Sequence, residues 1–116
     1  MEARIANISL RQGRDFLKTY EVFTVNSDGS EILRDISAWE ITAEIRVTQN
    51  SGADLLGTFV IAIDTINSII TLSLTDTVTQ IIPEGIWYYD ILVTIAGYDQ
   101  TYIEGNVTVY GGATKV

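Results

Sequence analysis

The residues of this sequence that could do acid–base or metal chemistry are its carboxylates. The chain has 116 residues, of which 15 are Asp or Glu, and it contains no Cys and no His. Without Cys there is no thiol nucleophile, disulfide or thiolate metal site. Without His, the commonest metal ligand and the usual base of a hydrolytic triad are missing. The carboxylates of Asp and Glu are therefore the first candidates for acid–base catalysis or metal binding by this chain.

Glu40 and Glu44 form the most suggestive carboxylate pair, because glycoside hydrolysis uses two carboxylates. Residues Trp39 to Thr48 alternate between apolar and polar side chains, which is typical of a strand with one buried and one solvated face. Four residues along a strand separate the two carboxylates by roughly 13 Å. We therefore interpret both as solvent-face residues and not as a catalytic pair.

The sequence lacks the other common motifs for catalysis and ligand binding. It has no Asp-x-Asp-x-Asp-Gly calcium loop, and isolated loop Asp residues usually stabilise turns. It has no Gly-x-Ser-x-Gly elbow, no phosphate-binding Gly-x-x-x-x-Gly-Lys loop and no Gly-x-Gly-x-x-Gly. We predict no catalytic residues, no metal ligands and no cofactor, with calcium as a minor alternative.

Aromatic residues gather in the last third of the chain, where they could form a carbohydrate-binding platform. They are Trp87, Tyr88, Tyr89, Tyr98, Tyr102 and Tyr110. Alternation instead predicts that Trp87 and Tyr89 face the core, at the head of a row that continues with Ile91, Val93 and Ile95. Trp39 is expected in the core as well. Tyr88, Asp90 and Tyr102 are predicted on one exposed sheet face, where Tyr is typical of protein interfaces.

The elements that must position these residues are mostly strands, because 40 of the 116 residues are Ile, Val or Thr. Alternating runs bounded by turn residues predict strands at 14–25, 39–48, 55–64, 69–74, 86–96 and 101–110. Phe16, Tyr20 and Val22 are expected to anchor the first of these. Turns are expected at 26–30, 49–54, 64–68, 83–85 and 97–100. Residues 75–81 predict one short helical turn with Thr75 as N-cap.

These elements predict an immunoglobulin-like antiparallel β-sandwich of about seven strands. Residues 1–13 are expected to be an N-terminal arm or edge strand, either on this domain or laid on another subunit. Residues 14–110 form the predicted sandwich, and residues 111–116 a flexible tail.

Charge is distributed unevenly along the chain, whose net charge is −8. Six of the seven basic residues lie in the first 46 positions, and none lies between Val47 and Thr114. This balance argues against nucleic acid as a partner. No stretch reaches the roughly 18 apolar residues of a membrane span, and the first residues lack signal-peptide features. The acidic stretch is expected to be solvated loops and strand faces, or alternatively a docking surface for a basic partner.

Four pieces of the chain together resemble a family of small phage and prophage virion proteins, related to the N-terminal domain of baseplate upper proteins. The first is Pro83-Glu84-Gly85-Ile86-Trp87-Tyr88-Tyr89-Asp90-Ile91. The others are the strand from Ile36 to Arg46, the run Ile69 to Thr75 with Thr79 and Ile82-Pro83, and Ile103-Glu104-Gly105-Asn106-Val107-Thr108-Val109. Trp87 stands where Tyr is usual, and Ala38 where Gly is common. The resemblance covers about residues 14 to 110.

The resemblance implies a non-enzymatic structural protein of a tailed-phage virion with an immunoglobulin-like fold. Its expected role is a tail, baseplate or fibre-attachment adaptor. Its expected partners are other virion proteins in a symmetric oligomeric assembly, built in the cytoplasm of the bacterial host. A capsid decoration protein is the first alternative, and a carbohydrate-binding module is a more distant one. An enzyme is the least favoured class.

Overall fold

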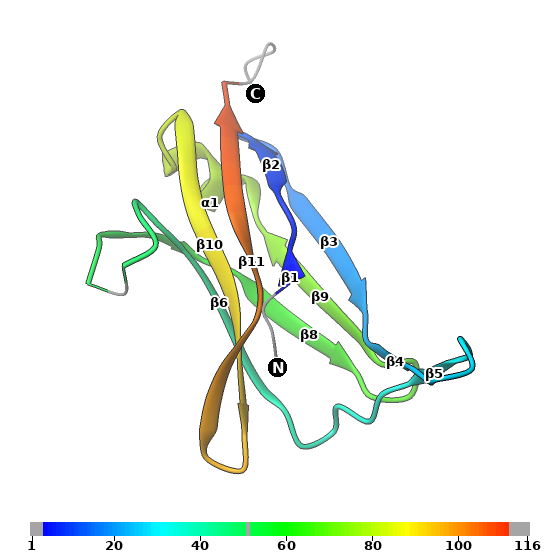
Figure 1. The fold of residues 1–116 in the computed structure, drawn as a ribbon. Helices are drawn as coiled ribbons and strands as arrows, with labels where there is room; N and C mark the ends of the chain where they lie inside the picture. The colour runs from blue at the N-terminus through cyan, green and yellow to red at the C-terminus, as the bar shows by residue number, and fades with distance from the viewer. Residues whose placement is uncertain (1–3, 51, 112–116) are drawn as a thin grey trace.

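Two β-sheets pack face to face in the computed structural model, which describes residues 4–50 and 52–111 (Figure 1). The larger sheet contains β1 (Arg4–Ile5), β2 (Ile8–Arg11), β6 (Glu40–Arg46), β7 (Leu55–Thr58), β10 (Gly85–Ile95) and β11 (Tyr98–Tyr110). The smaller sheet contains β3 (Phe16–Glu21), β8 (Val60–Asp64) and β9 (Ile69–Leu74). A separate hairpin is formed by β4 (Phe23–Val25) and β5 (Glu31–Leu33). The all-β sandwich predicted from the sequence is confirmed.

The core lies between the sheets. It consists of the apolar side chains that occupy every second position of the strands and point inward. Strand β10 contributes Tyr89, Ile91 and Val93, which are fully buried. The opposing sheet contributes Ile70 and Leu72 from β9, also fully buried. Burying one such side chain stabilises the fold by about 1.5–3 kcal/mol. The prediction that the row headed by Trp87 faces the core is thus confirmed, and Trp39 is buried as expected.

Two predicted strands are each divided in the structure. The strand expected over 14–25 ends at Glu21, because buried Val22 leaves the sheet and its N–H donates to the Ser68 carbonyl at 2.8 Å. The strand expected over 55–64 is split at buried Phe59, whose N–H donates to the Ala43 carbonyl at 2.9 Å. Strand β7 therefore pairs in the larger sheet while β8, which follows directly, pairs in the smaller one. The chain crosses between sheets here without a loop.

One turn and one strand also differ from expectation. The turn predicted at 97–100 is instead the pair Ala96 and Gly97, with φ of 52° and 83°, so that Tyr98 already pairs with Ile95. Positive φ at both positions is typical of a type I′ hairpin turn. Strand β5 lies in a segment where no strand was predicted.

The predicted helical turn is present as α1 (Asp76–Ile81), at one end of the sandwich (Figure 1). Thr75 occupies the N-cap position, but its side chain makes no capping hydrogen bond. The Asp15 carboxylate instead accepts a bond from the Asp76 N–H at 2.8 Å, and the buried Thr79 hydroxyl donates to the Arg14 carbonyl at 2.8 Å. The helix therefore joins the connection between β2 and β3 to the rest of the domain.

The N-terminal segment is an edge strand of this domain over its described residues. Strands β1 and β2 both pair in parallel with β11, an exception to the antiparallel pairing elsewhere. Ile8 and Leu10 are buried in the core. Where the two strands meet, the Tyr89 hydroxyl donates to the Ala6 carbonyl at 2.5 Å and lies 3.1 Å from the Tyr20 hydroxyl. This chain of hydroxyls connects the N-terminal segment to both sheets.

Among the described residues there is no helix long and apolar enough to cross a membrane. The predicted tail at 111–116 lies outside the described residues, except for Gly111.

Candidate functional site

A row of three carboxylates crosses the outer face of the larger sheet. The strand register places Asp90 of β10 opposite Glu44 of β6 on one side and opposite Glu104 of β11 on the other. Residues directly opposite in antiparallel strands have Cβ atoms about 4.5–5.5 Å apart. The three side chains therefore stand next to one another on three adjacent strands.

One cation accompanies the carboxylate row. An Arg46 guanidinium nitrogen lies 3.1 Å from Oε1 of Glu44, and the other terminal nitrogen donates to the Ala53 carbonyl at 2.9 Å. Two rows further along, past Leu92, Thr94 lies between Glu40 and Asp99 and donates to Asp99 Oδ1 at 2.6 Å. The outer face of these three strands is therefore strongly acidic, and Arg46 is engaged with Glu44.

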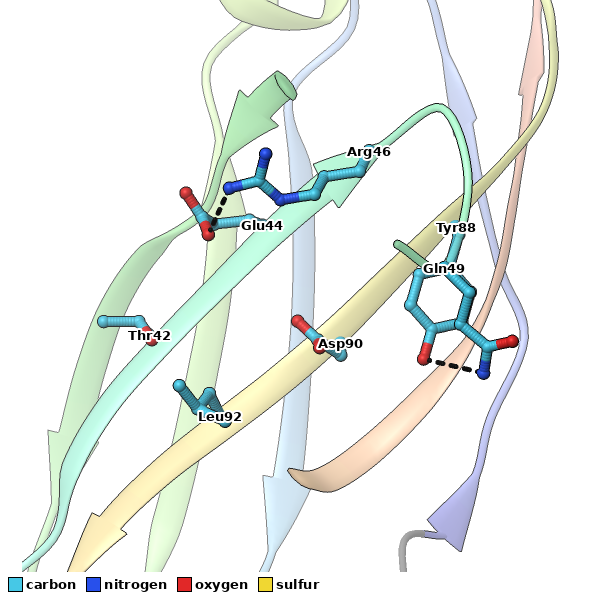
Figure 2. A pocket seen from close by; sticks show the side chains of 7 residues that line it. All are labelled: Thr42, Glu44, Arg46, Gln49, Tyr88, Asp90 and Leu92. Carbon is cyan, nitrogen blue, oxygen red and sulfur yellow. Dashed lines mark hydrogen bonds and ion pairs between the residues drawn. The ribbon is translucent and has the colours of Figure 1, made fainter. Parts of the chain in front are cut away.

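A small hollow of about 180 Å³ lies on this face beside the row (Figure 2). Its lining residues are Thr42, Glu44, Arg46, Gln49, Tyr88, Asp90 and Leu92. At its rim the Gln49 side-chain amide donates to the Tyr88 hydroxyl at 3.3 Å, and that hydroxyl donates to Glu104 Oε2 at 2.7 Å. Tyr88 thus holds the third carboxylate of the row in place.

The environment raises the pKa of Asp90 in the row and of Tyr88 beside it. Burial raises the pKa of Asp90 above its usual range, and the neighbouring charges of Glu44 and Glu104 raise it further, whereas Arg46 opposes them. Burial, followed by the hydrogen bond to Glu104, raises the pKa of Tyr88 to about 12. Tyr88 therefore remains a protonated donor at neutral pH, and the surroundings of Asp90 oppose its ionisation.

Replacing Asp90 with Asn is expected to stabilise the protein at neutral pH. A folded-state pKa above the unfolded value adds stability below the ordinary Asp pKa of about 3.9, and that stability is lost as the pH rises through the raised value. The Asn side chain keeps the shape and removes the repulsion, which we expect to be worth about 0.5–1 kcal/mol on this solvent-screened face. Thermal unfolding at pH 7 and at pH 3 measures the gain, which should vanish at pH 3.

Glu40→Gln is the matched control for this experiment. It removes the same charge at an exposed position that faces Thr94 instead of a carboxylate. A gain for Asp90→Asn that is equal at both pH values, or that Glu40→Gln reproduces, would show that the carboxylate row does not repel itself.

The arrangement fits docking better than catalysis. A raised carboxyl pKa beside an ionised carboxylate can serve acid–base chemistry. The hollow, however, is smaller than the roughly 300–1,000 Å³ of typical small-molecule sites. Among residues 4–50 and 52–111, no group of three or more Asp or Glu side chains is placed to hold a metal ion. An open acidic face is suited to the cationic side chains of a partner protein.

The sequence predicted the solvent-facing side for some residues of this site, but not which of them are neighbours across the strands. Glu40 and Glu44 lie on the solvent face as predicted, but the partner of Glu44 is Asp90 and not Glu40. Tyr88 and Asp90 share the outer face, as expected. Tyr102 does not, because it packs edge-on against Trp39 with ring centroids 5.5 Å apart.

The aromatic residues do not form one platform. Trp87 and Tyr89 belong to the core side, whereas Tyr88 is on the outer face. Tyr98 and Tyr110 are exposed but begin and end β11, so they lie at opposite ends of a strand of 13 residues. This dispersion disfavours the carbohydrate-binding interpretation.

No protein-family model matches the chain, and no curated protein matches it at a significant level.

Proposed function

We propose that the chain is a non-enzymatic structural protein of a tailed-phage virion, an adaptor that joins the tail or baseplate to a fibre or receptor-binding protein. The observation that carries its binding role is the row of Glu44, Asp90 and Glu104 on the outer face of the larger sheet. A rigid sandwich that presents such a charged face is suited to hold a partner of opposite charge. The virion context comes from the resemblance in sequence.

Structural roles of the resembling residues support the proposal. In the piece from Pro83 to Ile91, the Trp87 indole N–H donates to the Pro83 carbonyl at 2.8 Å. Gly85 lies against the same indole with a φ of 148°. In the closing strand, Gly105 allows the N-terminal segment to pass close by. The matching residues Pro83, Gly85 and Gly105 thus have structural roles in this fold, and Trp87 bonds Pro83 from a position where the family usually has Tyr. This favours a common fold, and function is inferred by analogy.

Image reconstruction of particles from a genome that encodes the chain tests the proposal. A few to some tens of copies at the tail or baseplate are expected. Hundreds of copies spread over the head would replace the adaptor role with capsid decoration. Absence from purified particles would overturn both virion roles.

A further inference from the structure

Strand β3 has an unpaired edge. It pairs with β9 on one side only, since the order in the smaller sheet is β3-β9-β8. In a β-strand the backbone N–H and C=O groups that face away from the single partner remain free to pair. Strands β1 and β2 form the corresponding edge of the larger sheet and lie on the same side of the molecule (Figure 1). No backbone hydrogen bond joins these two edges within the described residues.

A groove runs between the two edges. It consists of two hollows, of about 360 and 440 Å³, which share Asn7 and Lys18 among their lining residues. Phe16 and Tyr20 of β3 contribute aromatic rings to its wall, and Phe23 lies at its end. Strand β3 has six residues, a length of roughly 20 Å at about 3.4 Å per residue. The groove therefore has the length and the lining for one extended segment of about six residues.

The groove is cationic, in contrast to the acidic face of the larger sheet. Arg4 and Lys18 line it from opposite walls. Arg34 lies 5.1 Å from the centroid of the Trp39 ring, which packs edge-on against the groove residue Tyr102. None of these three cations forms an ion pair within the part of the chain that the structure describes. Glu21 is the one carboxylate among the residues lining the two hollows.

The position of Lys18 also has a simpler explanation. A lysine on the core-facing side of an edge strand discourages uncontrolled pairing with other chains. Lys18 is such a residue, because it lies directly opposite Leu72, which is fully buried. That role explains Lys18 alone. It does not explain why Arg4 stands on the facing wall and why Arg34 lies nearby.

We propose that this groove binds an extended, acidic segment of a neighbouring virion protein, which pairs with β3 as a fourth strand of the smaller sheet. Backbone pairing supplies affinity, as in other cases of strand addition. Phe16, Lys18 and Tyr20 share one face of β3, so every second side chain of the added strand faces the groove. These groove-facing side chains are apolar next to Phe16 and Tyr20, and carboxylates next to Lys18 and Arg4. The inference rests on the proposed function only in taking the partner to be a virion protein.

The probe is the acetylated octapeptide Val-Thr-Glu-Thr-Val-Thr-Glu-Thr, whose groove-facing positions are alternately Val and Glu, and the matched peptide has Lys in place of Glu. Backbone amide shifts of the intact protein are followed by NMR during titration with each peptide. The acidic peptide should shift and protect amides of residues 16–21 and 4–9, and the basic peptide should leave them unchanged. Raising the salt from about 20 to 300 mM should weaken the acidic complex several-fold, because the charges are solvent-accessible.

Lys18→Glu should weaken binding of the acidic peptide at least tenfold and permit binding of the basic one. Arg11→Glu is the matched control, because Arg11 stacks on Tyr110 and does not line the groove. Three outcomes would overturn the proposal: no shifts at millimolar acidic peptide, shifts confined to the outer face of the larger sheet, or equal effects of the two variants. Concentration-dependent shifts of β3 without peptide would identify a second copy as the occupant and also overturn it.

The peptide experiment and the particle experiment fail independently. Peptide binding by the isolated protein does not depend on where the chain sits in a virion. If neither peptide binds in the groove while the chain is found at the tail, the proposed function is supported and the proposal of a docking groove is wrong.

Discussion

Gly105→Ala is expected to displace the N-terminal strands from β11 and to lower the free energy of unfolding by about 3 kcal/mol. A Cβ at this position would overlap the carbonyl oxygen of Ala6 and lie 2.8 Å from its carbonyl carbon. Both atoms belong to the backbone, so no side-chain rotation can relieve the clash. The whole connection between β1 and β2 must move instead.

That movement breaks several interactions together. The Ala6 N–H donates to the Glu104 carbonyl at 2.9 Å, and the Ala6 carbonyl accepts from the buried Tyr89 hydroxyl. Each lost hydrogen bond costs about 0.5–1.5 kcal/mol, and the Tyr89 hydroxyl keeps Tyr20 as its other partner. Ile8 and Leu10 follow directly in β2, and they lose part of their burial if the segment shifts.

Urea denaturation measures the loss, with Asn106→Ala as control, because the Asn106 side chain is exposed and adjacent in sequence. Detachment of the segment also predicts a smaller dependence of the unfolding free energy on urea, since less surface is buried to begin with. Unchanged stability for Gly105→Ala would mean that the N-terminal strands do not lie where the structure places them.

Trp87→Ala is expected to destabilise the fold by about 3 kcal/mol. The indole packs against the core, and its N–H bond to the Pro83 carbonyl ties the connection between α1 and β10 to the start of β10. Trp87 is a partly buried aromatic side chain near the start of this strand, bonded back to the preceding corner. Such a corner is typical of immunoglobulin-like sandwiches, where Tyr usually has this role. Trp87→Phe keeps most of the packing and should lose only about 1 kcal/mol.

Tyr88→Ala separates this structural role from carbohydrate binding. Tyr88 faces outward at the rim of the hollow, so its loss should cost much less stability than the loss of Trp87. The variants are compared by thermal unfolding and by binding to a glycan array. If the Trp87→Ala protein is stable and has lost binding to a glycan, the carbohydrate interpretation is favoured. Trp87 would then not be needed to stabilise the connection between α1 and β10.

The sequence predicts the long alternating strands well and the places where strands change sheets poorly. Strand β10 could be predicted because it is rich in aromatic and β-branched residues and because every second residue from Trp87 to Ile95 is apolar. The sequence gives no such signal at Phe59. Apolar residues lie on both sides of it in the chain, and their types do not show that one side joins the larger sheet and the other the smaller one. The division at Val22 depends on its bond to Ser68, a partner distant in the sequence.

The error at Tyr102 has one physical cause. Ile91 pairs with Ile103 while Leu92 pairs with Thr101, so β11 has an extra residue, Tyr102, opposite this step. Such a bulge shifts the phase of the strand, and a strict period of two then assigns Tyr102 to the wrong face. The carboxylate row was missed for a related reason. Glu44, Asp90 and Glu104 each fall in the polar phase of their strands, but only the register between strands shows that they are neighbours.

The parallel pairing at the edge of the larger sheet determines how the molecule carries tension. Arg4 is opposite Ile103 and Arg11 is opposite Tyr110, so the first strands and the last strand run side by side in the same direction. A pull on the two ends of the described chain therefore drags these strands past each other lengthwise. Their cross-strand hydrogen bonds are then loaded in shear and share the force, whereas bonds peeled apart from one end break in succession. The sandwich is thus built to resist traction applied along the line that joins its ends.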